Sequence, residues 1–150
     1  MYALDERRDP LIILSVDGEP TMEQAQRIMD DVDMILERNR PFALIYDISA
    51  ASTPPRNVVR AILDWNRDAR ERYAELYERP VDAPPSFTAY YMGSPMLRGL
   101  LRFFLQMMPA VRTQVAVCTS LTEAVTLAER AMARAGVDVP HLGAHTQATG

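Results

Sequence analysis

The hydrophobic residues of this chain change their spacing repeatedly, and this alternation limits the possible folds more than any other feature. Short apolar runs, as expected for strands, alternate with longer segments whose apolar residues recur three, four and seven positions apart, as on one face of a helix. We expect strands at about residues 2–7, 11–16, 42–48, 86–92 and 113–118, and helices at about 21–40, from 53 onward, at 94–108 and at 120–135. The predicted element order is ββαβαβαβα.

This order predicts a mixed sheet in a single domain. Strands separated by single helices require right-handed crossover connections, which make neighbouring strands parallel. The first two strands are joined by the Asp9-Pro10 turn instead, so they should form an antiparallel hairpin. We therefore predict an α/β fold with about five strands, mostly parallel, an antiparallel N-terminal edge hairpin and four helices. A length of 150 residues suits one domain, which we place at residues 1–138, followed by a flexible C-terminal tail at 139–150.

The charge of the chain argues against several classes of partner. With a net charge of -4 and a pI near 5.2, the protein lacks the basic surface that nucleic acids and anionic membranes require. A single cysteine, Cys118, cannot form an internal disulfide, and the N-terminal residues lack the apolar core of a signal peptide. We expect a cytoplasmic protein with no nucleic-acid partner and no stable membrane insertion.

Two of the predicted helices begin with a capping box, in which a hydroxyl and a side chain three residues later satisfy free backbone N–H groups. These boxes are Thr21 with Gln24 and Ser120 with Glu123. The first helix is predicted to run to about Arg40, where basic residues match the negative end of the helix dipole.

The central strand at 42–48 ends in a carboxylate and several hydroxyls. In parallel α/β sheets, ligands and anions bind in the loops that connect the carboxyl ends of strands to the N-termini of the following helices. The candidate residues for a switch or a partner-binding site at this edge are Asp47, Ser49, Ser52, Thr53 and Arg56. A phosphate on Ser52 or Thr53 would gain from the helix dipole and from Arg56.

A purely structural interpretation of the same residues is also open. Thr53 can cap the following helix, with Pro54 at its first position. Ser49 and Ser52 would then be turn residues, and Asp47 would pair with a local N–H group or an arginine.

The segment 96–108 is predicted to be a helix whose apolar arc is wider than one sheet face covers. Its candidate residues for an interface or an apolar pocket are Met96, Leu97, Leu100, Leu101, Phe103, Phe104, Met107 and Met108. Methionines suit an adaptable surface, such as a homodimer contact, a partner interface or a ligand pocket. Deeper burial of the same helix beneath the preceding loop or the C-terminal tail explains the pattern equally well.

Signals for catalysis are weak. The sequence contains no glycine-rich phosphate loop, nucleophile elbow or zinc signature. His141 and His145 are four residues apart, but they lie in the predicted tail with no accompanying ligand pattern. Cys118 ends an apolar strand, where a buried and inert thiol is expected. We therefore predict a protein that is not an enzyme and has no cofactor and no metal.

Several of these features together resemble the STAS/SpoIIAA-like family of small bacterial proteins. They are a leading hairpin, a capped helix, a strand ending in Asp47-Ile-Ser49, a long helix containing Trp65, and a last strand followed by Thr119-Ser-Leu-Thr-Glu-Ala124. The likeness covers about residues 2–135. It implies a regulatory domain that binds a protein partner, often switched by phosphorylation of a serine at the start of the helix after the Asp-bearing strand.

The chain departs from the family pattern at the switch. Well-studied anti-sigma factor antagonists carry an Asp-Ser-Ser/Thr-Gly run, whereas this chain has Ala50-Ala-Ser-Thr-Pro-Pro55 without a glycine. Ser52 and Thr53 lie only approximately where the antagonists have their switch residues. Two hypotheses follow: a regulatory module resembling anti-sigma factor antagonists, or a carrier or sensor that binds a small apolar ligand between the sheet and the 96–108 helix.

Overall fold

The computed structural model describes residues 1–73, 86–106 and 115–141, except for the side chains of Arg70, Leu100, Phe104 and Leu105. Its sheet has five strands in the order β1-β2-β3-β4-β5. Strands β1 and β2 are antiparallel, and each later neighbour is parallel, as predicted. The strands are β1 (Tyr2–Arg8), β2 (Leu11–Val16), β3 (Phe42–Ile48), β4 (Ser86–Met92) and β5 (Val115–Cys118).

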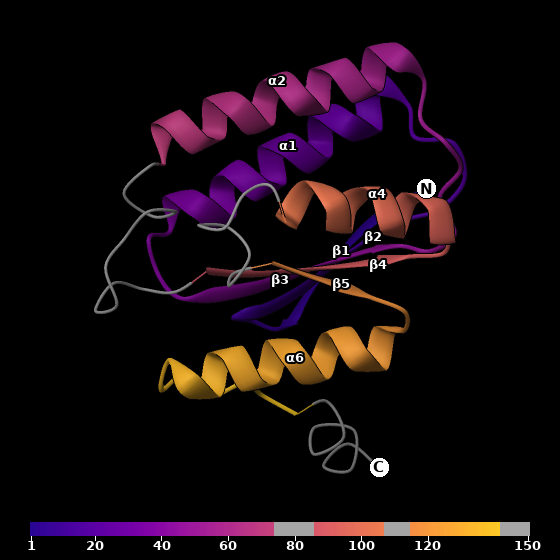
Figure 1. Cartoon of the computed structure of the whole chain (residues 1–150). Helices are drawn as coiled ribbons and strands as arrows, with labels where there is room; N and C mark the ends of the chain where they lie inside the picture. The colour runs from indigo at the N-terminus through magenta and orange to yellow at the C-terminus, as the bar shows by residue number, and fades with distance from the viewer. Residues whose placement is uncertain (74–85, 107–114, 142–150) are drawn as a thin grey trace, which may run out of the picture.

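The helices form two unequal layers. Helices α1 (Met22–Glu37), α2 (Arg56–Arg72) and α4 (Pro95–Gln106) cover one face of the sheet, and α6 (Leu121–Arg134) covers the other (Figure 1). Because the strand order advances in one direction, right-handed crossovers place every connecting helix on the same face. Helix α6 follows the last strand and is free to cover the opposite face. Among the described residues the element order is the predicted ββαβαβαβα.

The layer beneath the sheet is thin because it is built from small residues. Ala43 and Ala89 of the sheet face Ala124 and Ala128 of α6, and all four are fully buried. Alanine side chains let the helix axis approach the sheet closely, and Met132 fills the remaining space. Helix α6 covers this face together with Val137 and Val139, which follow it.

The layer above the sheet is thicker. Leu14, Val16 and Leu44 of the sheet pack against Val32 and Ile35 of α1. Helix α2 lies on the outer side of α1, farther from the sheet (Figure 1). Their contact is a separate cluster of Ala25, Met29 and Val58.

Helix α1 begins as predicted and ends earlier. The Thr21 hydroxyl accepts from the Gln24 N–H at 3.1 Å, and the Gln24 side chain accepts from the Thr21 N–H at 3.2 Å. The helix stops at Glu37, so the predicted extension to about Arg40 is wrong. Asn39 has a left-handed φ of 50°, which ends a helix without glycine.

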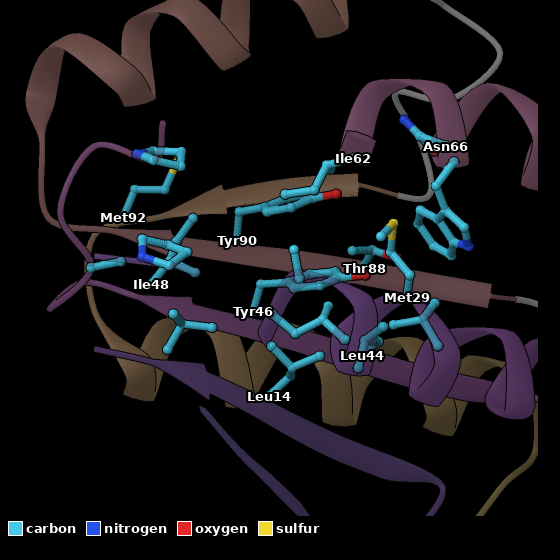
Figure 2. A pocket seen from close by; sticks show the side chains of 18 of the residues that line it. Leu14, Met29, Leu44, Tyr46, Ile48, Ile62, Asn66, Thr88, Tyr90 and Met92 are labelled. Atoms are coloured by element: carbon cyan, nitrogen blue, oxygen red, sulfur yellow. The ribbon is translucent and has the colours of Figure 1, made fainter. Parts of the chain in front are cut away.

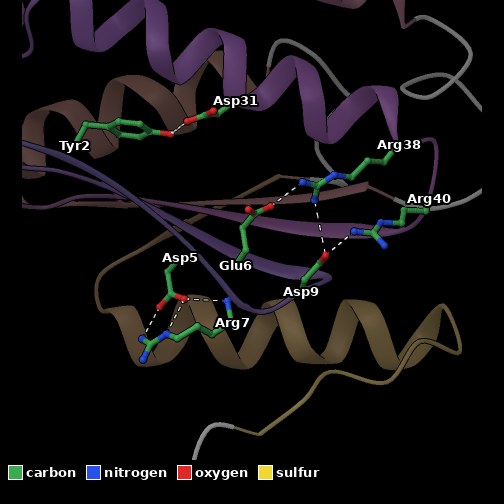
Figure 3. A network of polar contacts seen from close by, with 8 residues as sticks. All are labelled: Tyr2, Asp5, Glu6, Arg7, Asp9, Asp31, Arg38 and Arg40. Atoms are coloured by element: carbon green, nitrogen blue, oxygen red, sulfur yellow. Dashed lines mark hydrogen bonds and ion pairs between the residues drawn. The ribbon is translucent and has the colours of Figure 1, made fainter.

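The basic residues after α1 bind the N-terminal hairpin. Arg38 donates to Glu6 at 2.8 Å and also lies near Asp9, which Arg40 contacts as well (Figure 3). These side chains therefore serve tertiary contacts. They fix the β1–β2 turn against the C-terminal end of α1.

Helix α2 begins two residues later than predicted. It starts at Arg56 with Pro55 as its N-cap, so neither a Thr53 cap nor Pro54 at the first helical position is observed. The reason is the double proline: a residue that precedes proline is disfavoured in the α conformation. Thr53 and Pro54 both precede a proline, and Pro55 itself has extended backbone with a ψ of 155°.

The other two helices begin as the sequence indicates, with one change. The Ser94 hydroxyl accepts from the Leu97 N–H at 3.3 Å, and the Ser120 hydroxyl accepts from the Glu123 N–H at 3.1 Å. The Glu123 side chain does not accept from the Ser120 backbone N–H, as a complete capping box would require. Its carboxylate accepts instead from the backbone N–H and the hydroxyl of Thr119.

The chain remains in contact with the domain beyond residue 138. Val139 packs against the core between α6 and the sheet, and the Pro140 carbonyl accepts from Arg8 at 2.7 Å. Residues 142–150 lie outside the described residues, so the flexible tail stays a prediction.

Candidate functional site

The loop that follows β3 is held by backbone bonds to the loop that follows β2. The Ser52 N–H donates to the Gly18 carbonyl at 2.8 Å, and the Gly18 N–H donates to the Ala50 carbonyl at 3.1 Å. Gly18 adopts a φ of 71°, which glycine reaches without steric cost. The two loops therefore form one unit at the carboxyl ends of the strands.

Asp47 and Ser49 form a turn at the start of this loop. The Asp47 carboxylate accepts from the Ser49 hydroxyl at 2.7 Å and from its N–H at 3.3 Å. Both residues are half-buried. By strand alternation Asp47 lies on the α6 face, opposite to the face of Tyr46 and Ile48.

The loop after β4 touches this turn directly. A Cβ atom added at Gly93 would lie 2.6 Å from the Ser49 carbonyl oxygen, which is closer than real Cβ contacts. Glycine at this position therefore permits the two backbones to meet. Together, residues 17–20, 49–55 and 93–94 make a continuous surface, which we call the carboxyl edge.

The predicted switch residues divide into two groups at this edge. Asp47 and Ser49 are joined to each other, whereas the side chains of Ser52, Thr53 and Arg56 are exposed. The exposed hydroxyls lie just before the N-terminus of α2. Proline at the N-cap cannot accept a hydrogen bond with its side chain, so the positive end of α2 is not neutralised by its own cap.

A cavity of about 400 Å³ lies between the sheet and the three helices of the upper layer. Its floor is the upper face of β3 and β4, and α1, α2 and the start of α4 form its walls (Figure 2). Helix α2 packs on α1, whereas α4 contacts β4 and β5. The cavity lies between these helices and the sheet.

The floor of the cavity alternates between aromatic, aliphatic and small polar side chains. Tyr46 and Tyr90 are paired in register and stack with their ring centroids 4.9 Å apart and their planes 6° apart. Ser86 and Thr88 occupy neighbouring inward positions on β4. Their small size leaves room that larger residues at these positions would fill.

The apolar residues predicted on the 96–108 helix have different environments. Leu97 lines the cavity and Leu101 is half-buried, whereas Met96 and Phe103 are 78% and 58% exposed. The side chains of Leu100 and Phe104, and residues Met107 and Met108, lie outside the described residues. The described part of the helix thus contributes both to the cavity and to the surface.

Sequence reasoning placed a ligand beneath this helix and missed most of the actual walls. Met29 of α1, and Ile62 and Trp65 of α2, line the cavity, although their spacing indicated only core packing. A weak signal was present in β4. Ser86 and Thr88 are polar residues at positions that face the interior.

Other candidate chemistry finds no support within the described part of the chain. Burial, followed by the charge of Glu123, raises the pKa of the Cys118 thiol to about 11, as expected for an inert buried cysteine. Residues 1–73, 86–106 and 115–141 contain no group of three potential metal ligands, and His141 is exposed. His145 lies outside those ranges. None of the helices within them is long and apolar enough to cross a membrane.

Comparisons of sequence find no matching family and no matching curated protein. Comparisons of structure do find matches. An uncharacterized protein with a SpoIIAA-like fold from Shewanella loihica PV-4 has a TM-score of 0.60 at 10% identity, over 85% of this chain and 92% of the other.

Two anti-sigma factor antagonists are also similar. SpoIIAA in its unphosphorylated form has a TM-score of 0.57 at 12% identity, over 87% of this chain and 98% of the other. An antagonist from Mycobacterium paratuberculosis has a TM-score of 0.50 at 16% identity, over 86% and 93%. The chain therefore has the STAS/SpoIIAA-like fold that its sequence resemblance predicted.

Proposed function

We propose that the protein is a non-enzymatic regulatory domain that binds a protein partner in the cytoplasm through its carboxyl edge. The observation that carries this proposal is the loop at residues 49–55. Backbone bonds hold it to Gly18, while the side chains of Ser52 and Thr53 face solvent. A rigid loop with exposed side chains suits recognition, because little conformational entropy is lost on binding. Structural likeness to anti-sigma factor antagonists supports the same class of function.

Phosphorylation of Ser52 or Thr53 would control this surface. A phosphate adds nearly two negative charges next to the N-terminus of α2, where free N–H groups favour an anion. Arg56 is exposed in the first turn of the same helix and offers an additional cationic partner. The modified loop would present a charge that the unmodified loop lacks.

The proposal is tested by capturing the partner from the native cell and measuring its affinity for variants. We expect Ser52→Glu or Thr53→Glu to change the affinity at least tenfold, and Ser52→Ala to retain binding. Thr126→Glu, on the exposed side of α6, is the matched control and should bind like the wild type. Equal affinities for all variants would rule out the switch, and loss of binding in the control alone would place the interface elsewhere.

The exposed apolar part of α4 is a second contact surface in this proposal, either for the partner or for a second copy of the chain. Met96 and Phe103 are seven residues apart and therefore share one side of the helix. Light scattering on the wild type and on Phe103→Glu tests the homodimer. A dimer that the variant converts to a monomer supports self-association, and a monomeric wild type excludes it.

A carrier or sensor for a small apolar ligand is the second candidate function, and the cavity above β3 and β4 favours it. Its volume of about 400 Å³ lies in the range of small-molecule sites, and its walls are mainly apolar. Native mass spectrometry of freshly purified protein should show bound mass. A spectrum of the ligand-free chain alone, with no binding on addition of apolar compounds, would contradict this function.

A further inference from the structure

The shape of the cavity restricts its occupant. Four alternate positions of β3, from Phe42 to Ile48, line it, and the same holds for β4 from Ser86 to Met92. Six residue steps at ~3.3 Å give this floor a length of ~20 Å, which an extended chain can follow from end to end. A long chain therefore uses more of this apolar floor than a compact ring system does.

The chemistry of the walls points to an apolar chain. None of the described residues that line the cavity is charged. A charged group could therefore lie only at one of the ends, where water reaches it, because an unpaired charge inside would be strongly penalised. Figure 2 shows these ends: Ile48 and Met92 at one, and Asn66 at the other.

The two ends differ in charge. At the Asn66 end, the neighbouring Trp65 donates its ring N–H to the carboxylate of Asp33 at 3.2 Å, and Arg72 forms an ion pair with the same carboxylate at 3.3 Å, so these charges offset each other. At the carboxyl edge, the guanidinium of Arg98 donates to the Met92 carbonyl at 2.8 Å, and the polar residues Ser52 and Ser94 line the cavity. An anionic head group is therefore favoured at the carboxyl edge.

This placement brings the ligand against the proposed partner-binding surface. Ala51, Ser52 and Pro54 belong both to the cavity wall and to the loop that follows β3. Gly93, which also lines the cavity, touches the backbone of Ser49 in the same loop. A head group lodged here would contact the inner side of the surface whose outer side meets a partner.

From these observations we propose that the cavity binds a single-chain anionic amphiphile of the fatty-acid type. Its chain lies along β3 and β4, and its head group lies near Arg98 and Ser52, where it sets the position of the carboxyl-edge loops. This inference rests on the apolar-ligand function and adds to it the ligand class, its orientation and its link to the partner surface.

Calorimetric titration of the full chain with octanoate, decanoate, dodecanoate and tetradecanoate, each below its micelle concentration, tests the ligand class. We expect the affinity to rise about fourfold for each added methylene until the chain spans the ~20 Å floor. Dodecyltrimethylammonium, with the same chain and a cationic head, should bind at least tenfold more weakly than dodecanoate. Arg98→Gln should reduce this preference.

Position is tested by a matched pair of variants. Thr88→Phe fills the floor of the cavity and should weaken dodecanoate binding at least tenfold, whereas Thr122→Phe, on the exposed face of α6, should not change it. A wild-type measurement makes the test independent of how the variants fold. Dodecanoate should shift the NMR amide signals of Thr88, Ser52 and Gly93.

The outcomes distinguish failure of the amphiphile proposal from failure of the apolar-ligand function on which it rests. Binding of compact apolar compounds such as naphthalene, without any dependence on chain length, overturns the amphiphile and leaves the apolar-ligand function standing. Absence of binding by every probe overturns both. Chain binding that leaves the signals of Ser52 and Gly93 unchanged overturns the proposed orientation and its link to the loops.

Discussion

Replacing Gly93 by alanine tests the contact that joins the loops of the carboxyl edge. The added Cβ would lie 2.6 Å from the carbonyl oxygen of Ser49, and both partners are backbone atoms of short loops. Rotation of a side chain cannot relieve this contact. The φ angle of Gly93 is not in the left-handed region, so the effect of the substitution is steric.

The expected size follows from this geometry. Forcing one extra methyl group into a packed site costs about 1–3 kcal/mol. For a chain of 150 residues, each kcal/mol lowers Tm by about 2–4 °C, so Gly93→Ala should melt about 2–12 °C below the wild type. The amide signals of Ser49 and Ser52 should move as the loops separate.

Gly99→Ala provides the matched control. Within the described residues nothing lies within 4 Å of a Cβ added at Gly99, which sits in the interior of α4. Alanine there should stabilise the protein by about 0.8–1 kcal/mol through helix propensity. Urea denaturation measures both variants. A stability of Gly93→Ala within about 0.5 kcal/mol of the wild type would refute the close contact.

Three other predictions concern elements that position the site. Thr21→Ala removes the cap of α1 and should cost about 1 kcal/mol in urea unfolding. Burial, followed by the hydrogen bond to Asp31, raises the pKa of Tyr2 above its ordinary value near 10, so the free energy of unfolding should fall as the pH rises past about 10. The Tyr2→Phe variant should be about 1–2 kcal/mol less stable at pH 7, but its stability should fall less steeply above pH 10. At pH 8 Cys118, whose pKa burial raises to about 11, should react with a disulfide reagent at least ~100-fold more slowly than in the unfolded chain.

The strands of the sheet could be predicted closely because local signals bound them on both sides. The apolar run of β3 follows Pro41, and the run of β4 lies between Pro85 and Gly93. Proline and glycine interrupt regular structure for reasons of backbone geometry alone. Their effects can therefore be read without tertiary information.

Helix ends were less predictable because long-range contacts and backbone sterics compete there. Arg38 and Arg40 resemble charges that end a helix, yet they pair with Glu6 and Asp9 of the hairpin. At α2, the second proline prevents Pro54 from adopting helical backbone.

The candidate site was only partly predictable. The sequence placed Asp47, Ser49, Ser52 and Thr53 near one sheet edge, but it did not indicate that only the latter two would be exposed. The cavity depends on α2 resting on α1. This packing is a property of the tertiary structure, so local periodicity does not contain it.

Site-specific photocrosslinking in the native cell tests the central claim most directly. A photoreactive amino acid at Ser52 should give one defined protein adduct, because this exposed position lies on the proposed partner surface. The same amino acid at Arg130, exposed on α6, should give none. Adducts from position 130 without any from position 52 would contradict the account.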